Sequence, residues 1–254
     1  MNRITKAMTN ESKLLSIYFT AGFPALEDTV DIIEALQESG VDMIEIGLPY
    51  SDPLADGPTI QNSSTAALKN GMSTQKLFEQ IMEIRKTVHI PLLVMGYFNP
   101  MLQYGVEEFC KTCAEIGIDG LIMPDLPYAY WEEHYKEIYE KHNLQHVQLI
   151  TPQTSKERVF EIDKQSQDGF IYMVSSSATT GSQKGFQQEQ LDYFKRIDSY
   201  NLTSPRIVGF GIKDATTFVQ ATSTSKGAII GSAFIKMLSS DGKKGISKFI
   251  QSIR

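Results

Sequence analysis

Two carboxylates in the stretch 42–62 have surroundings suited to acid–base chemistry. Glu45 lies within a short apolar segment that is typical of a strand buried on both faces. Burial removes water from a carboxylate, which is costly unless the group is paired or protonated. Asp56 follows in a turn-rich loop that Pro53 and Pro58 stiffen. The pattern predicts a catalytic acid or base at Glu45, with Asp56 facing it across a pocket; a structural Glu45 paired with a core Lys or Arg is the alternative.

Turns that contain glycine follow the last three strand-like segments of the chain, and they suit phosphate binding. Backbone N–H groups at glycine turns and helix N-termini bind phosphate without a cationic side chain. One such glycine is weak evidence, because it also serves a tight turn, but Gly209-Phe210-Gly211 and Gly231-Ser232 lie one strand apart. The sequence has no Walker-A pattern, so a nucleoside triphosphate is not implied. We expect a phosphorylated substrate held by the Ser232 hydroxyl and by the N–H groups of Gly181, Gly211, Gly231 and Ser232.

The segment 175–185, SSSATTGSQKG, joins the sixth strand-like segment to the next helix-like one. Its small polar residues are compatible with a plain connector. They are equally compatible with a lid that closes over a substrate and excludes water. In the second case we expect Thr180 to contact the 42–62 loop.

Strand-like apolar segments alternate with helix-like amphipathic segments along the whole chain. The strand-like segments are 14–20, 43–46, 91–96, 120–123, 146–150, 170–174, 206–209 and 228–230. The helix-like segments are 1–11, 28–39, 59–69, 74–87, 107–116, 130–141, 156–165, 188–200, 215–221 and 244–253. This alternation indicates parallel strands joined by right-handed crossovers. We predict an α/β fold over residues 1–254, a single (β/α)8 TIM barrel domain with an extra N-terminal helix, rather than an open doubly wound sheet.

A barrel places its catalytic groups on the loops at the C-terminal ends of its strands. The residues that this rule selects are Glu45, Asp56, Tyr97, Asp125, Tyr172 and the glycines after the last three strands. We therefore expect these residues to share one site.

The composition excludes several classes of protein. The 254 residues carry a net charge of −6 and no Lys/Arg patch, which argues against a nucleic-acid partner. No apolar run is long enough to span a membrane and no signal-peptide core is present, so we expect a cytoplasmic protein. The four histidines lack metal-ligand spacing, so no metal site is predicted. Cys110 and Cys113 form a C-x-x-C on a predicted helix, where two reduced thiols are favoured over a redox pair.

The run from Glu45 to Gln61, EIGLPYSDPLADGPTIQ, closely resembles the signature of the tryptophan synthase alpha chain family. Shorter motifs of that family occur in order along nearly the whole chain: YFTAG at 18–22, GYFNP at 96–100, PDLP at 124–127, GFG at 209–211 and GS at 231–232. The resemblance implies a (β/α)8 barrel that splits indole-3-glycerol phosphate into indole and glyceraldehyde 3-phosphate by retro-aldol cleavage. It also implies an α2β2 assembly that passes indole to a β chain carrying pyridoxal phosphate, whereas the alpha chain itself needs no cofactor.

The resemblance implies roles for individual residues. Glu45 matches the acid that later acts as base, which suits a carboxyl whose pKa burial raises. Asp56 matches the position that accepts a hydrogen bond from the indole N–H as positive charge develops. The slot for the flat ring is expected to be lined by Tyr18, Tyr97 and Ile122, and the site and lid to be supported by Tyr172 and Thr180, with packing as the alternative role. The rim loops that would contact the β chain carry Asp52, Pro53, Asp125 and Pro127, for which a solvated turn is the alternative.

The chain departs from the family pattern within the 175–185 segment. Ser176 and Ala178 stand where the family usually has Arg and Gly. The missing guanidinium removes a charge-assisted contact to a loop carboxylate such as Asp52, and an alanine is strained where a glycine uses φ > 0. We expect a more disordered lid and weaker closure or coupling to the partner.

Two other functions stay open on the sequence. A phosphosugar isomerase or a different aldolase would fit the barrel, although no strand-like segment ends in the lysine that a Schiff-base aldolase needs. A catalytically weak barrel that mainly binds and activates a partner chain is the second alternative, in view of Ser176 and Ala178.

Overall fold

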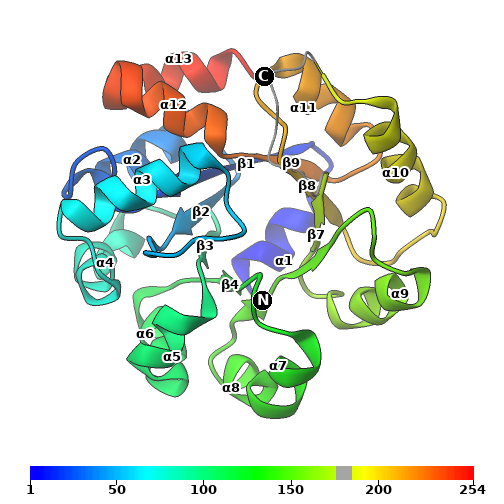
Figure 1. Cartoon of the computed structure of the whole chain (residues 1–254), viewed down its shortest axis with the longest axis horizontal. Helices are drawn as coiled ribbons and strands as arrows, with labels where there is room; N and C mark the ends of the chain where they lie inside the picture. The colour runs from blue at the N-terminus through cyan, green and yellow to red at the C-terminus, as the bar shows by residue number, and fades with distance from the viewer. Residues whose placement is uncertain (176–184) are drawn as a thin grey trace.

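The computed structural model describes residues 1–175 and 185–254. Helices surround a central sheet of parallel strands, which is viewed along the barrel in Figure 1. The strands are β1 (Leu14–Thr20), β2 (Met43–Gly47), β3 (Leu92–Met95), β4 (Gly120–Ile122), β5 (Gln145–His146), β6 (Gln148–Ile150), β7 (Ile171–Val174), β8 (Arg206–Gly209) and β9 (Gly227–Ile230). Their order in the sheet is β5-β4-β3-β2-β1-β9-β8-β7-β6.

The first and last strands of this order are two halves of one extended segment. Only Val147 separates β5 from β6, and its N–H donates to the Leu121 carbonyl at 3.1 Å. The segment pairs with β4 before Val147 and with β7 after it, so the sheet curls into a nearly closed barrel. The predicted (β/α)8 barrel is thereby confirmed and the open sheet is wrong, although the predicted strand 146–150 is divided.

The helices differ from the predicted ones mainly where short helices follow one another. The α-helices are α1 (Arg3–Met8), α2 (Asp28–Glu38), α3 (Pro58–Lys69), α4 (Thr74–Ile81), α5 (Phe98–Tyr104), α6 (Val106–Ile116), α7 (Tyr128–His134), α8 (Lys136–Lys141), α9 (Lys156–Gln165), α10 (Gln188–Asp198), α11 (Ala215–Thr222), α12 (Ser232–Asp241) and α13 (Ile246–Gln251), with 3-10 turns at Ile84–Lys86 and Gly242–Gly245. The predicted helix 130–141 is wrong as one element, because α7 and α8 divide it, and the ranges of α5 and α12 are not among the predicted helix-like segments.

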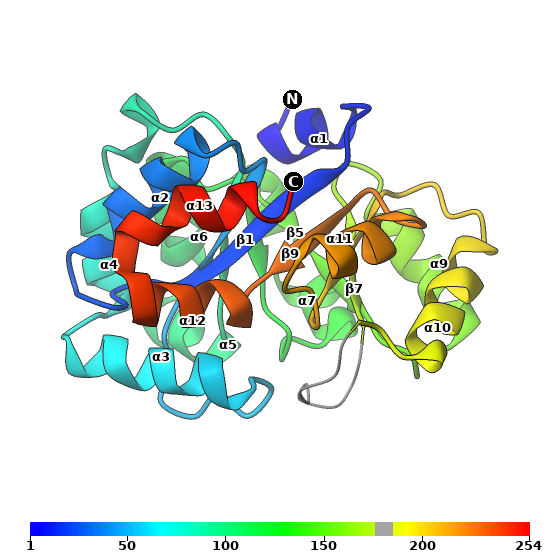
Figure 2. The same cartoon turned by 90° about the horizontal axis from the view of Figure 1, so that it is seen from above.

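The apolar side chains form two separate layers of core. The larger layer lies between the sheet and the helices, where both cysteines of α6 are buried as free thiols. The smaller layer fills the barrel and includes Leu14, Met43, Leu93, Ile122, Phe170, Tyr172, Ile207 and Ile229. Helix α1 lies beyond the start of β1 and closes that end of the barrel with Ile4, Ala7 and Met8 (Figure 2).

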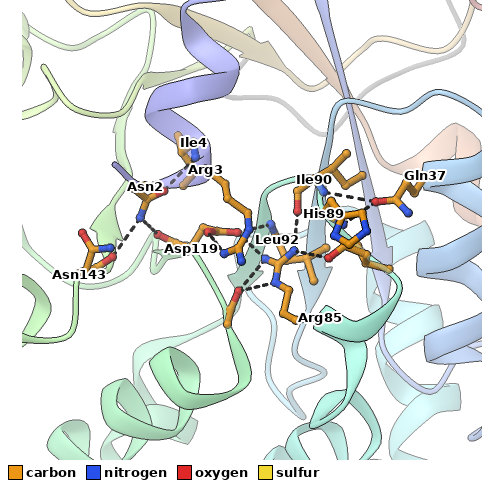
Figure 3. Close-up of polar contacts among 12 residues, drawn as sticks. Asn2, Arg3, Ile4, Gln37, Arg85, His89, Ile90, Leu92, Asp119 and Asn143 are labelled. Atoms are coloured by element: carbon orange, nitrogen blue, oxygen red, sulfur yellow. Dashed lines mark hydrogen bonds and ion pairs between the residues drawn. The ribbon is translucent and has the colours of Figure 1, made fainter.

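A polar network fixes α1 to the start of the barrel (Figure 3). The Asp119 carboxylate accepts hydrogen bonds from Arg3 Nη1 at 2.9 Å, from Arg85 Nη2 at 2.5 Å and from the Leu92 N–H at 2.9 Å. The Asn2 side chain donates to the Asp119 carbonyl at 2.9 Å. This end of the barrel is therefore closed by satisfied polar groups, which leaves the opposite rim for chemistry. Within residues 1–175 and 185–254, no helix combines the length and the apolar character needed to cross a membrane.

Candidate active site

A cavity of about 330 Å³ opens at the C-terminal ends of the strands, and its size suits one small ligand. Most of its walls come from the loops after β2, β3 and β4 and from β1, β6 and β7. The lining residues are Tyr18, Leu48, Tyr50, Leu54, Ala55, Asp56, Ser64, Met95, Gly96, Tyr97, Pro124, Leu149, Val174 and Phe210. Four predicted site residues are thus brought together here: Tyr18, Asp56, Tyr97 and Phe210.

The side chain of Asp56 has one described polar partner in the cavity wall. The Tyr97 hydroxyl donates to Asp56 Oδ2 at 3.1 Å and accepts the Ala55 N–H at 2.9 Å. Gln61, at the start of α3, donates to the Asp56 carbonyl at 2.9 Å and holds the loop in place. Burial raises the pKa of Asp56, although the Tyr97 hydrogen bond acts in the opposite direction. An acceptor of this kind is suited to an N–H donor within the cavity.

Glu45 is fully buried in β2, beneath the cavity rather than in its wall. The Ser16 hydroxyl donates to Oε1 at 3.3 Å, whereas Oε2 has no hydrogen-bond partner in the described parts of the chain. Burial raises the pKa of Glu45 to about 8, against the smaller opposing effect of the Ser16 hydrogen bond. The carboxyl is therefore mostly protonated at neutral pH and can act as a proton donor. The alternative of a Lys or Arg partner for Glu45 is wrong for residues 1–175 and 185–254.

Two tyrosines lie close enough to both carboxylates to respond to their charges. The charges of Asp56 and Glu45 add to burial in raising the pKa of Tyr18 and of Tyr172. Glu45 and Asp56 are thus near the same phenols, but only Asp56 lines the cavity. The predicted arrangement, with both carboxylates facing each other across the open pocket, is not the one seen here. Tyr172 and Ile122 likewise belong to the barrel interior and not to the cavity wall.

Each of these tyrosines lies against a glycine on the next strand. A Cβ atom at Gly47 would lie 2.2 Å from the Tyr18 hydroxyl oxygen, and one at Gly209 would lie 2.2 Å from that of Tyr172. Gly47 ends β2 beside β1, and Gly209 ends β8 beside β7. In this structure, Gly209 provides room for a phenol, which is a different role from the substrate contact predicted for it.

Three of the predicted phosphate residues, Gly211, Gly231 and Ser232, follow the ends of β8 and β9. Phe210 and Gly211 have φ values of 70° and 78°, so consecutive residues adopt the left-handed conformation. The Ser175 hydroxyl donates to the Phe210 carbonyl at 2.7 Å and holds this turn. Helix α12 begins at Ser232, directly after Gly231, and its first N–H groups have no acceptor within the helix. Gly211 and Ser232 follow the neighbouring strands β8 and β9, whereas Thr180, Gly181, Ser176 and Ala178 lie outside the described residues.

The rim residues predicted to contact a partner have unequal environments. Asp52, Asp125 and Pro127 are exposed, and Pro53 is half-buried. Asp125 Oδ1 accepts the Phe98 N–H at 2.8 Å and so holds the start of α5. The sequence analysis missed Leu54, which is 93% exposed in the loop after β2.

Ser16 was also missed, although the sequence carried a signal. It is the one polar residue before Tyr18 in the apolar strand LLSIYFT, and such a residue in a buried strand needs a partner. In the described parts of the chain, no group of three His, Cys, Asp or Glu side chains could hold a metal ion.

Comparison with known proteins places this barrel in a family. The family described as "Tryptophan synthase alpha chain" matches residues 4–253. Tryptophan synthase alpha chains of Flavobacterium psychrophilum and Christiangramia forsetii are 63% and 60% identical, over all of this chain and 100% and 99% of theirs. The crystal structure of tryptophan synthase subunit alpha from Legionella pneumophila superposes with a TM-score of 0.89 at 32% identity, over 100% of this chain and 97% of that one. A tryptophan synthase structure from M. tuberculosis gives 0.86 at 29% identity, over 100% and 98%. The chain therefore belongs to the tryptophan synthase alpha chain family.

Proposed function

We propose that the chain cleaves indole-3-glycerol phosphate to indole and glyceraldehyde 3-phosphate, the alpha reaction of tryptophan synthase in L-tryptophan biosynthesis. Family membership over the whole chain carries this conclusion. A cavity of suitable size, with Asp56 in its wall and a protonated Glu45 beneath it, supports it. The reaction is a carbon–carbon bond cleavage of the lyase class.

The chemistry assigns complementary tasks to the two carboxylates. Glu45 gives its proton to the indole carbon that bears the glycerol chain. The bond to that chain then breaks as the Glu45 carboxylate takes the proton of the adjacent hydroxyl and an aldehyde forms. Asp56 accepts a hydrogen bond from the indole N–H while positive charge develops on the ring. Glu45 ends the cycle protonated, so no net proton is consumed.

The remaining predicted residues bind the two ends of the substrate. We assign the ring to a slot beside Tyr18 and Tyr97, with Ile122 and Tyr172 supporting it from the barrel interior. The phosphate is assigned to the N–H groups of Gly211 and Ser232 and to the Ser232 hydroxyl, together with Gly181 and Gly231. The left-handed turn at Phe210 and the start of α12 support this assignment.

The proposal also covers the oligomeric assembly and the cellular location of the chain. The chain acts as one barrel domain in the cytoplasm and pairs with a tryptophan synthase β chain in an α2β2 tetramer. The rim carrying Asp52, Pro53, Asp125 and Pro127 is the contact surface, and the exposed Leu54 supports it, because an apolar side chain at a loop tip gains by being covered. The alpha reaction needs no cofactor on this chain, and pyridoxal phosphate belongs to the β chain.

The test is indole release from indole-3-glycerol phosphate by the wild-type chain and by Glu45→Gln. A positioned acid–base group contributes about 10²–10⁴-fold, so we expect a loss of that size. Glu79→Gln makes the same substitution on the exposed face of α4 and should keep the wild-type rate. If Glu45→Gln stays within about threefold of wild type on that scale, the assigned role of Glu45 is wrong.

One specific observation favours a second candidate. Since Glu45 does not line the cavity, the chain would act mainly as a binding and activating subunit if the carboxyl never reached the substrate. The same assay decides between the two, because such a subunit would release indole slowly with or without Glu45.

A further inference from the structure

Ser16 is a polar side chain in the interior of the barrel that the proposed reaction does not use. It lies in β1, is fully buried, and is on the same face of the strand as Leu14 and Tyr18, whose side chains face the barrel interior. Its hydroxyl donates to Glu45 Oε1 at 3.3 Å. No other hydrogen bond to the Glu45 carboxyl occurs in the described parts of the chain.

The register of the sheet shows in which direction the Glu45 side chain extends. Glu45 is paired with Tyr18 across β1 and β2, and Ser16 is paired with Met43. The carboxyl nevertheless bonds to Ser16, which lies two residues nearer the start of β1 than its own pairing partner. The side chain therefore leans toward the closed end of the barrel and away from the rim that carries Asp56.

The other ionisable groups near Glu45 do not hold its carboxyl in this position. Tyr18 on β1 and Tyr172 on β7 respond to its charge, and Asp56 acts on the same two phenols from the loop after β2. None of the three donates a hydrogen bond to Glu45 in the described structure, and neither does a Lys, Arg or His. The serine hydroxyl is thus the group that fixes the depth of this carboxyl.

We propose that Ser16 is a positioning residue for Glu45: its hydroxyl holds the carboxyl below the cavity in the ligand-free chain, and this hydrogen bond is released when Glu45 reaches the bound substrate. The inference rests on the proposed function, because it assumes that Glu45 acts on a molecule in the cavity. It names a residue that the sequence motif around Glu45 does not contain.

The proposal predicts different effects on two pH profiles. A hydrogen bond to the ionised carboxylate favours that form, so removing it raises the pKa of Glu45 in the free chain. The pH dependence of kcat/KM reports groups in the free enzyme, and that of kcat reports groups in the substrate complex. If the hydrogen bond exists only before substrate binds, its loss shifts the pH profile of kcat/KM and leaves the pH profile of kcat unchanged.

The experiment compares the full-length wild-type chain with Ser16→Ala. Glutamate labelled with ¹³C at the side-chain carboxyl allows NMR titration of Glu45 without substrate, with Glu45→Gln identifying its signal. We expect Ser16→Ala to raise the pKa of Glu45 by about 1, as loss of one hydrogen bond implies. The Glu45 limb of the kcat/KM profile should move upward by the same amount, and the kcat limb should stay in place.

Two further variants separate positioning from a general loss of structure. Ser16→Thr retains a hydroxyl on a residue type common in strands and should restore the wild-type titration. Ser225→Ala removes another buried serine hydroxyl, before β9, and should leave the Glu45 titration unchanged.

Three results would overturn the proposal. A pKa of Glu45 that is unchanged in Ser16→Ala removes Ser16 as its partner. A kcat limb that moves together with the kcat/KM limb shows that the hydrogen bond persists in the substrate complex. A Ser16→Thr chain that folds but titrates like Ser16→Ala shows that the hydroxyl is not what matters. Failure of the proposed function would look different, because the NMR titration would still respond to Ser16 while Glu45→Gln kept its activity.

Discussion

Asp119 and Glu45 are both buried carboxylates inside the same barrel, but their surroundings are opposite. Asp119, at 4% exposure, meets two arginines and a backbone N–H at the closed end. Glu45, with no exposed surface, meets a single serine hydroxyl in the barrel interior beneath the cavity. The sequence left open a structural role for Glu45, as the partner of a core Lys or Arg. Asp119 has this role instead.

The difference teaches how one chemical group serves either stability or reactivity. Breaking a buried ion pair leaves an uncompensated charge, so a paired carboxylate such as Asp119 holds the fold together. An unpaired buried carboxyl keeps its proton and is ready to donate it, at a cost in stability when it must ionise. Burial also disfavours the charged form of a cation. Desolvation lowers the pKa of Arg85 to about 10, although Asp119 beside it acts in the opposite direction.

The largest effect on stability is expected from Asp119→Asn. The amide keeps the shape but removes the charge that faces Arg85, whose side chain is only 16% exposed. We expect the free energy of unfolding to fall by about 3–5 kcal/mol, as for other broken buried pairs. Urea unfolding measures it, and Arg3→Ala is the control, because that arginine is 44% exposed and its pair should contribute about 1 kcal/mol or less. A loss below about 1 kcal/mol in Asp119→Asn would show that the network is not structural.

The matching substitution Glu45→Gln should have the opposite sign. The pKa of Glu45 is about 8 in the folded chain against an ordinary value of 4.5. Between these values the folded chain keeps a proton that the unfolded chain releases, so stability falls as pH rises through this window and levels off above it. The slope is at most about 1.4 kcal/mol per pH unit, so glutamine, which does not titrate, should stabilise the fold by a few kcal/mol at pH 9.

Urea unfolding at pH 5, 7 and 9 measures this second effect. Glu79→Gln serves again as the control, since an exposed side chain should change little over the same range. Wild-type and Glu45→Gln stabilities that change in parallel with pH would contradict the environment described for Glu45.

The sequence was sufficient to predict the barrel fold and to select residues on the loops at its C-terminal rim. Most strands are short apolar runs, and signals such as Gly117 after α6 and Pro58 at the start of α3 are local. Asp56 and Tyr97 were placed correctly in one cavity, because both lie on loops that follow the C-terminal ends of neighbouring strands. Such features depend on neighbours in the chain, which the sequence displays.

The errors concern contacts between residues that are distant in the chain. Ser16 is 29 residues from Glu45, and Arg3 is 116 residues from Asp119, so neither pairing leaves a local pattern. The depth of the Glu45 carboxyl depends on strand register and on a side-chain rotamer.

The two ends of the barrel also differ in what surrounds a glycine, as Gly227 and Gly47 show. A Cβ at Gly227, at the start of β9, would lie 2.4 Å from the Leu14 carbonyl oxygen, and one at Gly47 would lie 2.2 Å from the Tyr18 hydroxyl. Backbone cannot move aside as a side chain can, so Gly227→Ala should destabilise by about 2–3 kcal/mol and Gly47→Ala by about 1–2 kcal/mol. Indole release should show the reverse order, because only Gly47→Ala displaces a ring that lines the cavity. Equal activities of the two variants at matched folded fractions would contradict the role given to Tyr18.

The smallest effect is expected at the proposed phosphate site, from Ser175→Ala. The Ser175 hydroxyl holds the Phe210 carbonyl, and a non-glycine residue in the left-handed conformation costs about 1–3 kcal/mol unless its surroundings hold it there. Losing this hydrogen bond, worth about 1 kcal/mol, lets the turn relax and should raise KM about fivefold. Because the turn is assigned to the phosphate and not to the reacting carbons, kcat should change less than KM. Ser204→Ala, which removes a buried hydroxyl bonded to the Asp163 carbonyl, should alter neither constant. A fall in kcat with KM unchanged would instead connect Ser175 to the carboxylates, and the proposed phosphate site and the carboxylates would then not be independent.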